Sequence, residues 1–233
     1  MGNARNIADG ETRFVNVAGD SMTGNLEVDG ILEIDKTGDH PAMRFVEDGS
    51  NTRAYLGSGD WAINGLANDD FGISSSSTGD LVLGTTAGVE RLRIDNAGRV
   101  TMPYQPAFFA RHLSASAYLT QYVDGWTAVT YNVGNHFVGS TGIFTAPVAG
   151  IYQVNAMIGN NYAQGDGNYQ IRVNNLAYNG LNFDPFSSQT TWATNVLVGQ
   201  VKLSVNDTVR IFCNGNGYPD NSDWTSWSMC LIA

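Results

Sequence analysis

The sequence changes character near Pro103, and this change limits the folds that are open to the chain. Of its 25 aromatic residues, 20 lie in residues 103–233, whereas residues 19–102 hold only four. Residues 19–102 carry 14 acidic and six basic residues, while residues 103–233 carry six Asp and no Glu. Because aromatic side chains supply much of the buried area of a core, the second block predicts a globular head and the first a thin shaft.

The shaft segment lacks the side chains that would let it fold alone. With few aromatics, short apolar runs and a net charge of −8 in residues 19–102, it buries too little surface to offset its ordering entropy as a monomer. We therefore expect it to intertwine with copies of itself. Residues 103–233 are numerous enough to bury their own core.

The charge and hydropathy of the chain limit the kinds of partner that it can bind. A formal net charge of −10 disfavours nucleic acid and acidic membrane surfaces, because phosphate contacts need Lys and Arg. No run of about 18 apolar residues occurs, and the first residues lack the apolar stretch of a signal peptide. We expect a soluble protein that makes no membrane insertion.

Turn residues and alternating patterns predict an all-β chain. Gly, Asn, Asp and Ser recur at intervals of about 8–12 residues, and no helical period is sustained. Residues 168–173 place their apolar side chains at odd positions, and residues 151–158 include a run of them at even positions. Such alternation is typical of a strand with one face on a core.

The last apolar segment has a different pattern. Trp227, Met229 and Leu231 fill one face of a strand over residues 227–232, and Cys230 and Ile232 fill the other. A strand that is apolar on both faces needs cover on both. Cys213 and Cys230 are the only cysteines, and they are either two free thiols or one disulfide.

Two stretches before Pro103 resemble bacteriophage tail-fibre proteins. Residues 19–24, GDSMTG, followed by NLEVDG, are similar to an element that begins a trimeric β-structured stem in such fibres. Residues 89–103 resemble the sequence that precedes their terminal domain. The resemblance implies a virion-docking segment at residues 1–18, an interwoven β shaft at residues 19–102, and a protein made in the host cytoplasm and carried on the virion.

The block after Pro103 resembles the globular head of the first complement component, which shares its fold with the tumour necrosis factor superfamily. The resemblance lies in residues 107–110 (AFFA), an F-x-x-P-x-x-G-x-Y element, a Leu-x-x-Gly-Asp-x-Val element and an aromatic-initiated last strand. The matching positions are Phe144, Pro147, Gly150, Tyr152, Leu203, Asp207, Val209 and Trp227, with Asn206 in place of the usual Gly. Asn tolerates the left-handed conformation that this Gly adopts.

This second resemblance implies a jelly-roll sandwich at residues 103–233, with ten strands in two sheets, that trimerises through one sheet. It accounts for a last strand that is apolar on both faces. The predicted trimer interface comprises Trp227, Met229, Cys230, Leu231 and Ile232.

The head lacks the residues that a polysaccharide-cleaving enzyme would need. Glycoside hydrolysis uses two carboxylates about 5–9.5 Å apart. The acidic residues of the head all lie in turn-like contexts, at Asp124, Asp166, Asp184, Asp207, Asp220 and Asp223. No P-loop, HExxH or GxSxG motif occurs. We predict no catalytic residues and no cofactor.

Two segments of the head are candidates for contact with a receptor. They combine aromatic rings with amides and carboxylates, a mixture that suits a glycan. Residues 214–226 supply Tyr218, Asp220, Asn221, Asp223 and Trp224, and residues 179–192 supply Phe183, Phe186 and Trp192. The alternative is a flexible loop with an aromatic anchored in the core. Asp220 and Asp223 could instead hold Ca²⁺, but their spacing misses the EF-hand pattern, and we predict no metal.

These observations together predict a homotrimeric phage tail fibre, or receptor-binding protein, that attaches the virion to a bacterial surface without chemistry. Several weak sites on one head would act by avidity. The main alternative is a structural capsid or collar fibre that decorates the virion. A polysaccharide depolymerase is disfavoured by the missing pair of carboxylates.

Overall fold

The structure is a computed structural model that describes residues 42–47, 51–58, 63–65, 67, 70–76, 78–86, 88–113, 118–161, 167–183, 192–217, 219 and 224–233. The chain separates into two compact units, residues 1–79 and 80–233. Every regular element among the described residues is a β-strand, as predicted. None of these residues belongs to a helix that is long and apolar enough to cross a membrane. The predicted boundaries at residues 18 and 102 stay predictions.

The first unit contains one antiparallel sheet, with the strand order β1-β2-β3. Its strands are β1 (Ala42–Glu47), β2 (Asn51–Ser58) and β3 (Phe71–Ser75). Phe71 is 69% exposed, and Phe45 and Ile73 are about half exposed. The sheet thus has apolar side chains but no layer of its own chain, among the described residues, that buries them.

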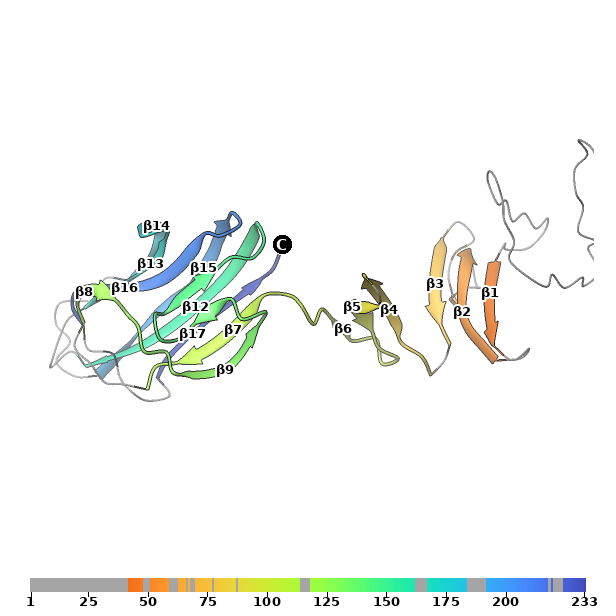
Figure 1. The fold of residues 1–233 in the computed structure, drawn as a ribbon, viewed down its shortest axis with the longest axis horizontal. Coiled ribbons are helices and arrows are strands. Elements are labelled where there is room, and N and C mark those ends of the chain that lie inside the picture. The colour runs from red at the N-terminus through yellow and green to blue at the C-terminus, as the bar shows by residue number, and fades with distance from the viewer. Residues whose placement is uncertain are drawn as a thin grey trace, which may run out of the picture. The chain divides into compact units, whose positions relative to one another are not determined.

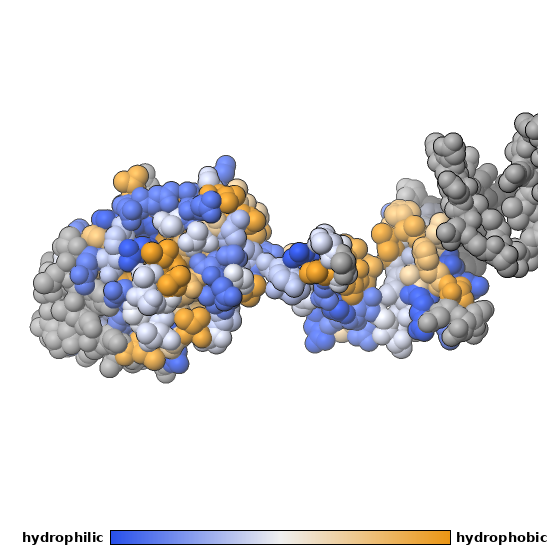
Figure 2. Space-filling view, viewed as in Figure 1, coloured by the Kyte–Doolittle hydropathy of each residue, from blue (hydrophilic) through white to orange (hydrophobic). Residues whose placement is uncertain are grey.

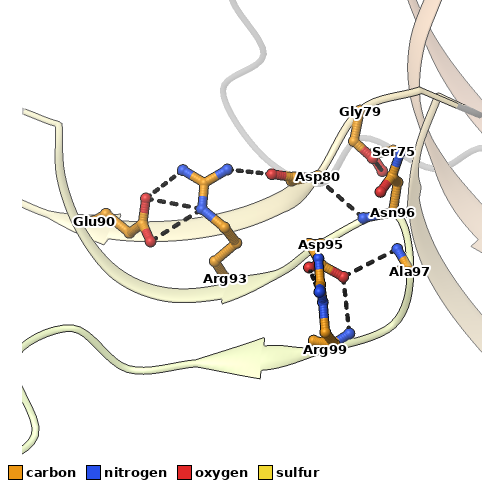
Figure 3. Close-up of polar contacts among 9 residues, drawn as sticks. All are labelled: Ser75, Gly79, Asp80, Glu90, Arg93, Asp95, Asn96, Ala97 and Arg99. Carbon is orange, nitrogen blue, oxygen red and sulfur yellow. Dashed lines mark hydrogen bonds and ion pairs between the residues drawn. The ribbon is translucent and has the colours of Figure 1, made fainter.

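The second unit begins with a small sheet of β4 (Leu81–Thr85), β5 (Val89–Ile94) and β6 (Val100–Thr101). The turn after β5 ends at Gly98, whose φ is +82°. The Asp95 carboxylate accepts the backbone N–H groups of Ala97 and Arg99, at 3.0 and 2.9 Å (Figure 3). These bonds, led by the one from Arg99, lower the pKa of Asp95. The residues Asn96, Ala97 and Gly98 thus form the turn that joins β5 to β6.

One cation fastens β5 to the start of this small sheet. The Arg93 guanidinium forms ion pairs with Asp80 and Glu90 (Figure 3). Its hydrogen bonds lower the pKa of Glu90. These pairs are partly exposed, so they orient the strands more than they stabilise them.

The rest of the second unit is a sandwich of two antiparallel sheets (Figure 1). The five-stranded sheet has the order β15-β12-β17-β7-β9. Its strands are β15 (Trp192–Leu203), β12 (Gly150–Asn161), β17 (Thr225–Leu231), β7 (Ala107–Arg111) and β9 (Ala128–Val133).

The six-stranded sheet has the order β10-β11-β16-β13-β14, and its sixth strand, β8, also pairs with β16. Its strands are β10 (Phe137–Val138), β11 (Ile143–Thr145), β16 (Thr208–Gly217), β13 (Asn168–Val173), β14 (Leu176–Phe183) and β8 (Tyr118–Tyr122).

The strand count of the six-stranded sheet exceeds the expected one because two strands share one edge of β16. β11 pairs with the beginning of β16, where Thr145 faces Thr208, and β8 pairs with its end, where Tyr118 faces Gly217. The predicted ten strands therefore become six and five, while the two-sheet jelly-roll architecture is as expected.

The core lies between the two sheets and is rich in aromatic rings. Phe108 stacks on Phe137 with ring centroids 4.0 Å apart, and Trp227 meets Phe108 edge-on at 5.0 Å. Trp126 packs against Trp227 at 5.7 Å. All buried hydrophobic residues among those described lie in this sandwich. The concentration of aromatics after Pro103 thus corresponds to the head's core.

The predicted alternation of two strands is confirmed. In β12, Tyr152, Val154 and Ile158 are fully buried between the sheets, as are Tyr169 and Ile171 in β13. The two cysteines are not joined in a disulfide: Cys213 lies in the core, and Cys230 lies on β17 of the opposite sheet.

Candidate functional site

Both predicted receptor segments leave the sandwich at the same end, which we call the loop end. Register shows this, because Asn161 faces Trp192, Tyr169 faces Phe183 and Gly217 faces Tyr118. The two sheets are aligned here by the Tyr169 hydroxyl, which donates to Asn160 Oδ1 at 2.6 Å. The strand ends that flank residues 184–191 and 218–223 are therefore neighbours.

The chain enters the head at the opposite end of the sandwich (Figure 1). At the start of β7, Ala107 faces Cys230, and the Leu231 N–H donates to the Pro106 carbonyl at 3.0 Å. β7 then runs to Arg111, which faces Ser226 near the loop end. The loop end is thus the end of the head that is remote from residue 106.

The base of the 214–226 segment is anchored on β12. Pro219 forms an isolated bridge with Asn160, and the Gly159 N–H donates to the Trp224 carbonyl at 2.9 Å. Gly217 must be glycine, because a Cβ there would collide with Cys213 Sγ and the Tyr169 hydroxyl. The segment thus rises from a fixed base.

Trp224 keeps 54% of its surface exposed, so its ring is not the core anchor of the alternative interpretation. Phe183 and Trp192 are placed as the last residue of β14 and the first of β15. The other predicted receptor residues, Tyr218, Asp220, Asn221, Asp223 and Phe186, lie outside the described residues, as do the virion-docking segment and the GDSMTG motif. The structure therefore brings the two segments to one end, and the receptor assignment stays a prediction.

The last strand divides the predicted interface residues between two faces. Trp227 and Met229 lie in the core of their own head, and Leu231 is partly buried against that core. These three residues have their packing partners within the chain, so their assignment to the trimer interface is corrected. Cys230 and Ile232 lie on the outward face, and Ile232 is about half exposed.

The outward face of the five-stranded sheet carries an exposed apolar surface, which we call the outward apolar face. Phe109 of β7 stacks on Tyr131 of β9 with ring centroids 6.3 Å apart. In the same row of the sheet, Phe109 faces Ser228, Ser228 faces Asn155, and Asn155 faces Val198. Its exposed apolar side chains are Tyr131, Ile151, Met157, Val196, Val198 and Ile232.

Sequence reasoning missed most of this outward apolar face. Residues 196–198, Val-Leu-Val, carried the signal, because an apolar run on both faces of a strand repeats the pattern of residues 227–232. Leu197 is buried in the core, and Val196 and Val198 are more than half exposed.

The described carboxylates of the head include one that is fully engaged in a turn. Asp207 accepts hydrogen bonds from Asn174 Nδ2 and the Ser204 N–H, both at 2.7 Å. The bond from Asn174 contributes most to the lowered pKa of Asp207. A general acid needs the opposite shift, so Asp207 serves the turn. No group of three or more His, Cys, Asp or Glu in the described part of the chain is arranged to hold a metal.

Comparison with known proteins yields structural likeness only. No protein family and no curated protein matches the chain. The globular domain of the zebrafish complement 1qA protein is 19% identical and covers 55% of this chain and 98% of its own, with a TM-score of 0.46. Murine APRIL at pH 5.0 is 11% identical over 55% and 99%, with a TM-score of 0.42, and Eiger TNF from S. frugiperda is 14% identical over 56% and 94%, with a TM-score of 0.43.

Proposed function

We propose that this protein is a homotrimeric phage tail fibre, or receptor-binding protein, whose head attaches the virion to a glycan on the bacterial surface. The observation that carries the proposal is that, among the described residues, the buried hydrophobic side chains all lie in the head. The described strands before residue 102 expose their apolar side chains, so they require further copies of the chain (Figure 2). A β shaft made from several copies, followed by a globular head, is the organisation of a fibre.

The outward apolar face supports association of the heads as well. It is built on five adjacent strands, and its central strand presents the small side chains of Ser226, Ser228 and Cys230. Small residues at the centre let copies of the sheet approach closely, while Tyr131, Val196 and Val198 supply apolar area on both sides. A second and a third copy of this chain are the occupants that this face fits, because they also complete the shaft.

The location of the loop end supports a role in recognition. Residues displayed at the end remote from the shaft connection are the ones that a virion presents to a cell. A trimer of heads would present three copies of the loop end, and this would raise the effective affinity of weak individual contacts. In this proposal the head binds without catalysis, and the chain is made in the host cytoplasm and carried on the virion.

The test compares adsorption of the full chain and two variants to host cells. Trp224→Ala removes the exposed ring of the loop end and should reduce adsorption about tenfold or more. Tyr104→Ala is the matched control, because it removes a ring of similar exposure, 57%, that precedes β7, the first strand of the sandwich. The trimer should persist in both variants by light scattering. Equal adsorption of all three proteins would overturn the receptor site, and no adsorption of the unaltered chain to any susceptible strain would favour a decorating fibre.

A further inference from the structure

The outward face of the six-stranded sheet holds two arginines side by side. Arg172 on β13 faces Arg210 on β16. The next pair on the same face of the sheet, toward the loop end, is Gln170 and Phe212. Phe212 in turn faces Tyr122 on β8. We call Arg172 and Arg210 the arginine pair. Three strands that are far apart in the sequence thus place two cations and two aromatic rings together.

Both guanidinium groups lie over aromatic rings. The Arg172 Cζ is 3.3 Å from the centre of the Phe212 ring, and the Arg210 Cζ is 3.8 Å from that of Tyr122. The two rings meet edge-on at 5.2 Å. The Tyr122 hydroxyl is fixed by donating to Asn175 Oδ1 at 2.8 Å. Cation–π contact therefore holds both side chains in defined orientations.

Within the described part of the chain, no ion pair balances the charge of the arginine pair. The head has four basic residues, and two of them form the arginine pair in a protein of net charge −10. Like charges directly opposite each other on a sheet are destabilising. Neither arginine forms an ion pair with a carboxylate of the described residues. Burial lowers the pKa of Arg210, and Tyr122 and Asp124 offset only part of this effect.

The hydrogen bonds described for Arg172 and Arg210 do not use all of their N–H groups. Arg210 Nη2 donates to the Thr141 carbonyl at 2.8 Å, and its buried Nε has no partner within the described chain. Among the described residues, the Arg172 guanidinium donates only to Gln170 Oε1, over long distances of 3.3 and 3.4 Å. Both side chains are partly exposed. Terminal N–H groups of two oriented guanidiniums are thus left to bind a ligand from solution.

We propose that Arg172 and Arg210 form an oxyanion-binding site that takes the carboxylate or phosphate group of an acidic surface glycan. Two forked guanidiniums match the oxygens of both groups, and binding an anion relieves the repulsion between the cations. The choice of a glycan as the source rests on the proposed function, whereas the oxyanion chemistry does not. The site lies on the sheet opposite to the outward apolar face, so association through that face leaves it open.

The test is calorimetric titration of the full chain with galacturonate, galactose and inorganic phosphate. Galacturonate differs from galactose by a carboxylate in place of a hydroxymethyl group, so a gain for galacturonate isolates the charge. We expect galacturonate or phosphate to bind, galactose not to bind, and added salt to weaken binding. The anion that binds more tightly shows whether the site prefers the carboxylate or the phosphate group.

Two variants locate the binding. Arg172→Gln should weaken anion binding about tenfold or more, and Arg172→Lys, which keeps the charge but loses the fork, should fall between. Lys202→Gln is the matched control, because it removes one positive charge from an exposed position on the other sheet. An unchanged near-ultraviolet circular dichroism spectrum shows that the aromatic core is intact.

Each outcome has one interpretation. Absence of binding by both anions, or binding that Arg172→Gln and Lys202→Gln weaken equally, overturns the site. Loss of anion binding without loss of cell adsorption keeps the oxyanion site and overturns its role in glycan recognition. A failure of Trp224→Ala to affect adsorption concerns the proposed receptor site at the loop end and leaves the anion titration as it stands.

Discussion

The head and the shaft sheets of this protein use apolar side chains in opposite ways. In the head, Phe108, Trp126 and Trp227 are fully buried between two sheets of the same chain. In the sheet β1-β2-β3, Phe45, Phe71 and Ile73 are largely exposed in the single chain. Exposed apolar area of this kind is stable only when something covers it, so we expect the head to fold by itself and the shaft to fold only with further copies of the chain.

The five-stranded sheet shows both behaviours within one layer. Its inward face carries the core residues Val154 and Met229, and its outward face carries Val198 and the stacked rings of Phe109 and Tyr131. Folding of the head and the proposed association of the heads would therefore depend on different residues of the same strands. This separation allows the two processes to be broken one at a time.

The largest expected effect is on the core of the head. Trp227→Ala removes a ring that packs on Phe108, Phe137 and Trp126, and should lower the free energy of unfolding by about 3–5 kcal/mol. Trp224→Ala makes the same chemical change three residues away at a half-exposed ring, and should change it by about 0.5 kcal/mol or less. Denaturant unfolding of the full chain measures both. Equal losses would show that the two rings are not in different environments.

The next effect concerns association of the heads. Val198→Asp places a carboxylate on the outward apolar face, where a neighbouring copy would have to desolvate it. The test uses a fragment of residues 103–233, because the shaft of the full chain is proposed to associate by itself. The variant fragment should be monomeric but keep its core, so light scattering should report one third of the mass of the unaltered fragment while the aromatic circular dichroism is unchanged. Val138→Asp, on the six-stranded sheet, is the control and should leave the trimer intact. A stable trimer of the Val198→Asp variant would place the interface elsewhere.

A smaller effect is expected in the shaft. Phe71 is exposed in the single chain, yet Phe71→Ala should destabilise the trimer by about 1.5–3 kcal/mol per chain if other copies cover the ring. Val205→Ala, at a similarly exposed position in a turn of the head, should be close to neutral. Trimer dissociation measured by analytical ultracentrifugation at several concentrations distinguishes them. If both variants match the unaltered chain, the shaft sheet does not assemble through β3.

Much of the fold follows from local patterns, and the site follows from non-local ones. The alternation of apolar and polar residues was sufficient to predict β12 and β13 and their buried faces, because a half-buried strand has a period of two residues. Asn206, predicted to replace a left-handed Gly, has a φ of +70°. The sequence predicted one trimer interface from both faces of the last strand, because two apolar faces look alike until the opposite sheet is known. The arginine pair could not be predicted, since only the register of β13 and β16 brings Arg172 to Arg210.

The smallest expected effect tests whether the head's turns add to its stability independently of association. Hydrogen bonds from Asn174 and the Ser204 N–H lower the pKa of Asp207, so its carboxylate favours the folded state. For a lowered pKa the contribution is complete above the unfolded value, near 3.8, and is lost as the pH falls through the folded value. Asp207→Asn should therefore cost up to about 1 kcal/mol at neutral pH, and the difference should vanish in acid. Thermal melts of the monomeric Val198→Asp head between neutral and acidic pH measure this difference, with Asp124→Asn as the control for charge. A difference that stays constant with pH would mean that the Asp207 carboxylate does not stabilise this turn by its charge.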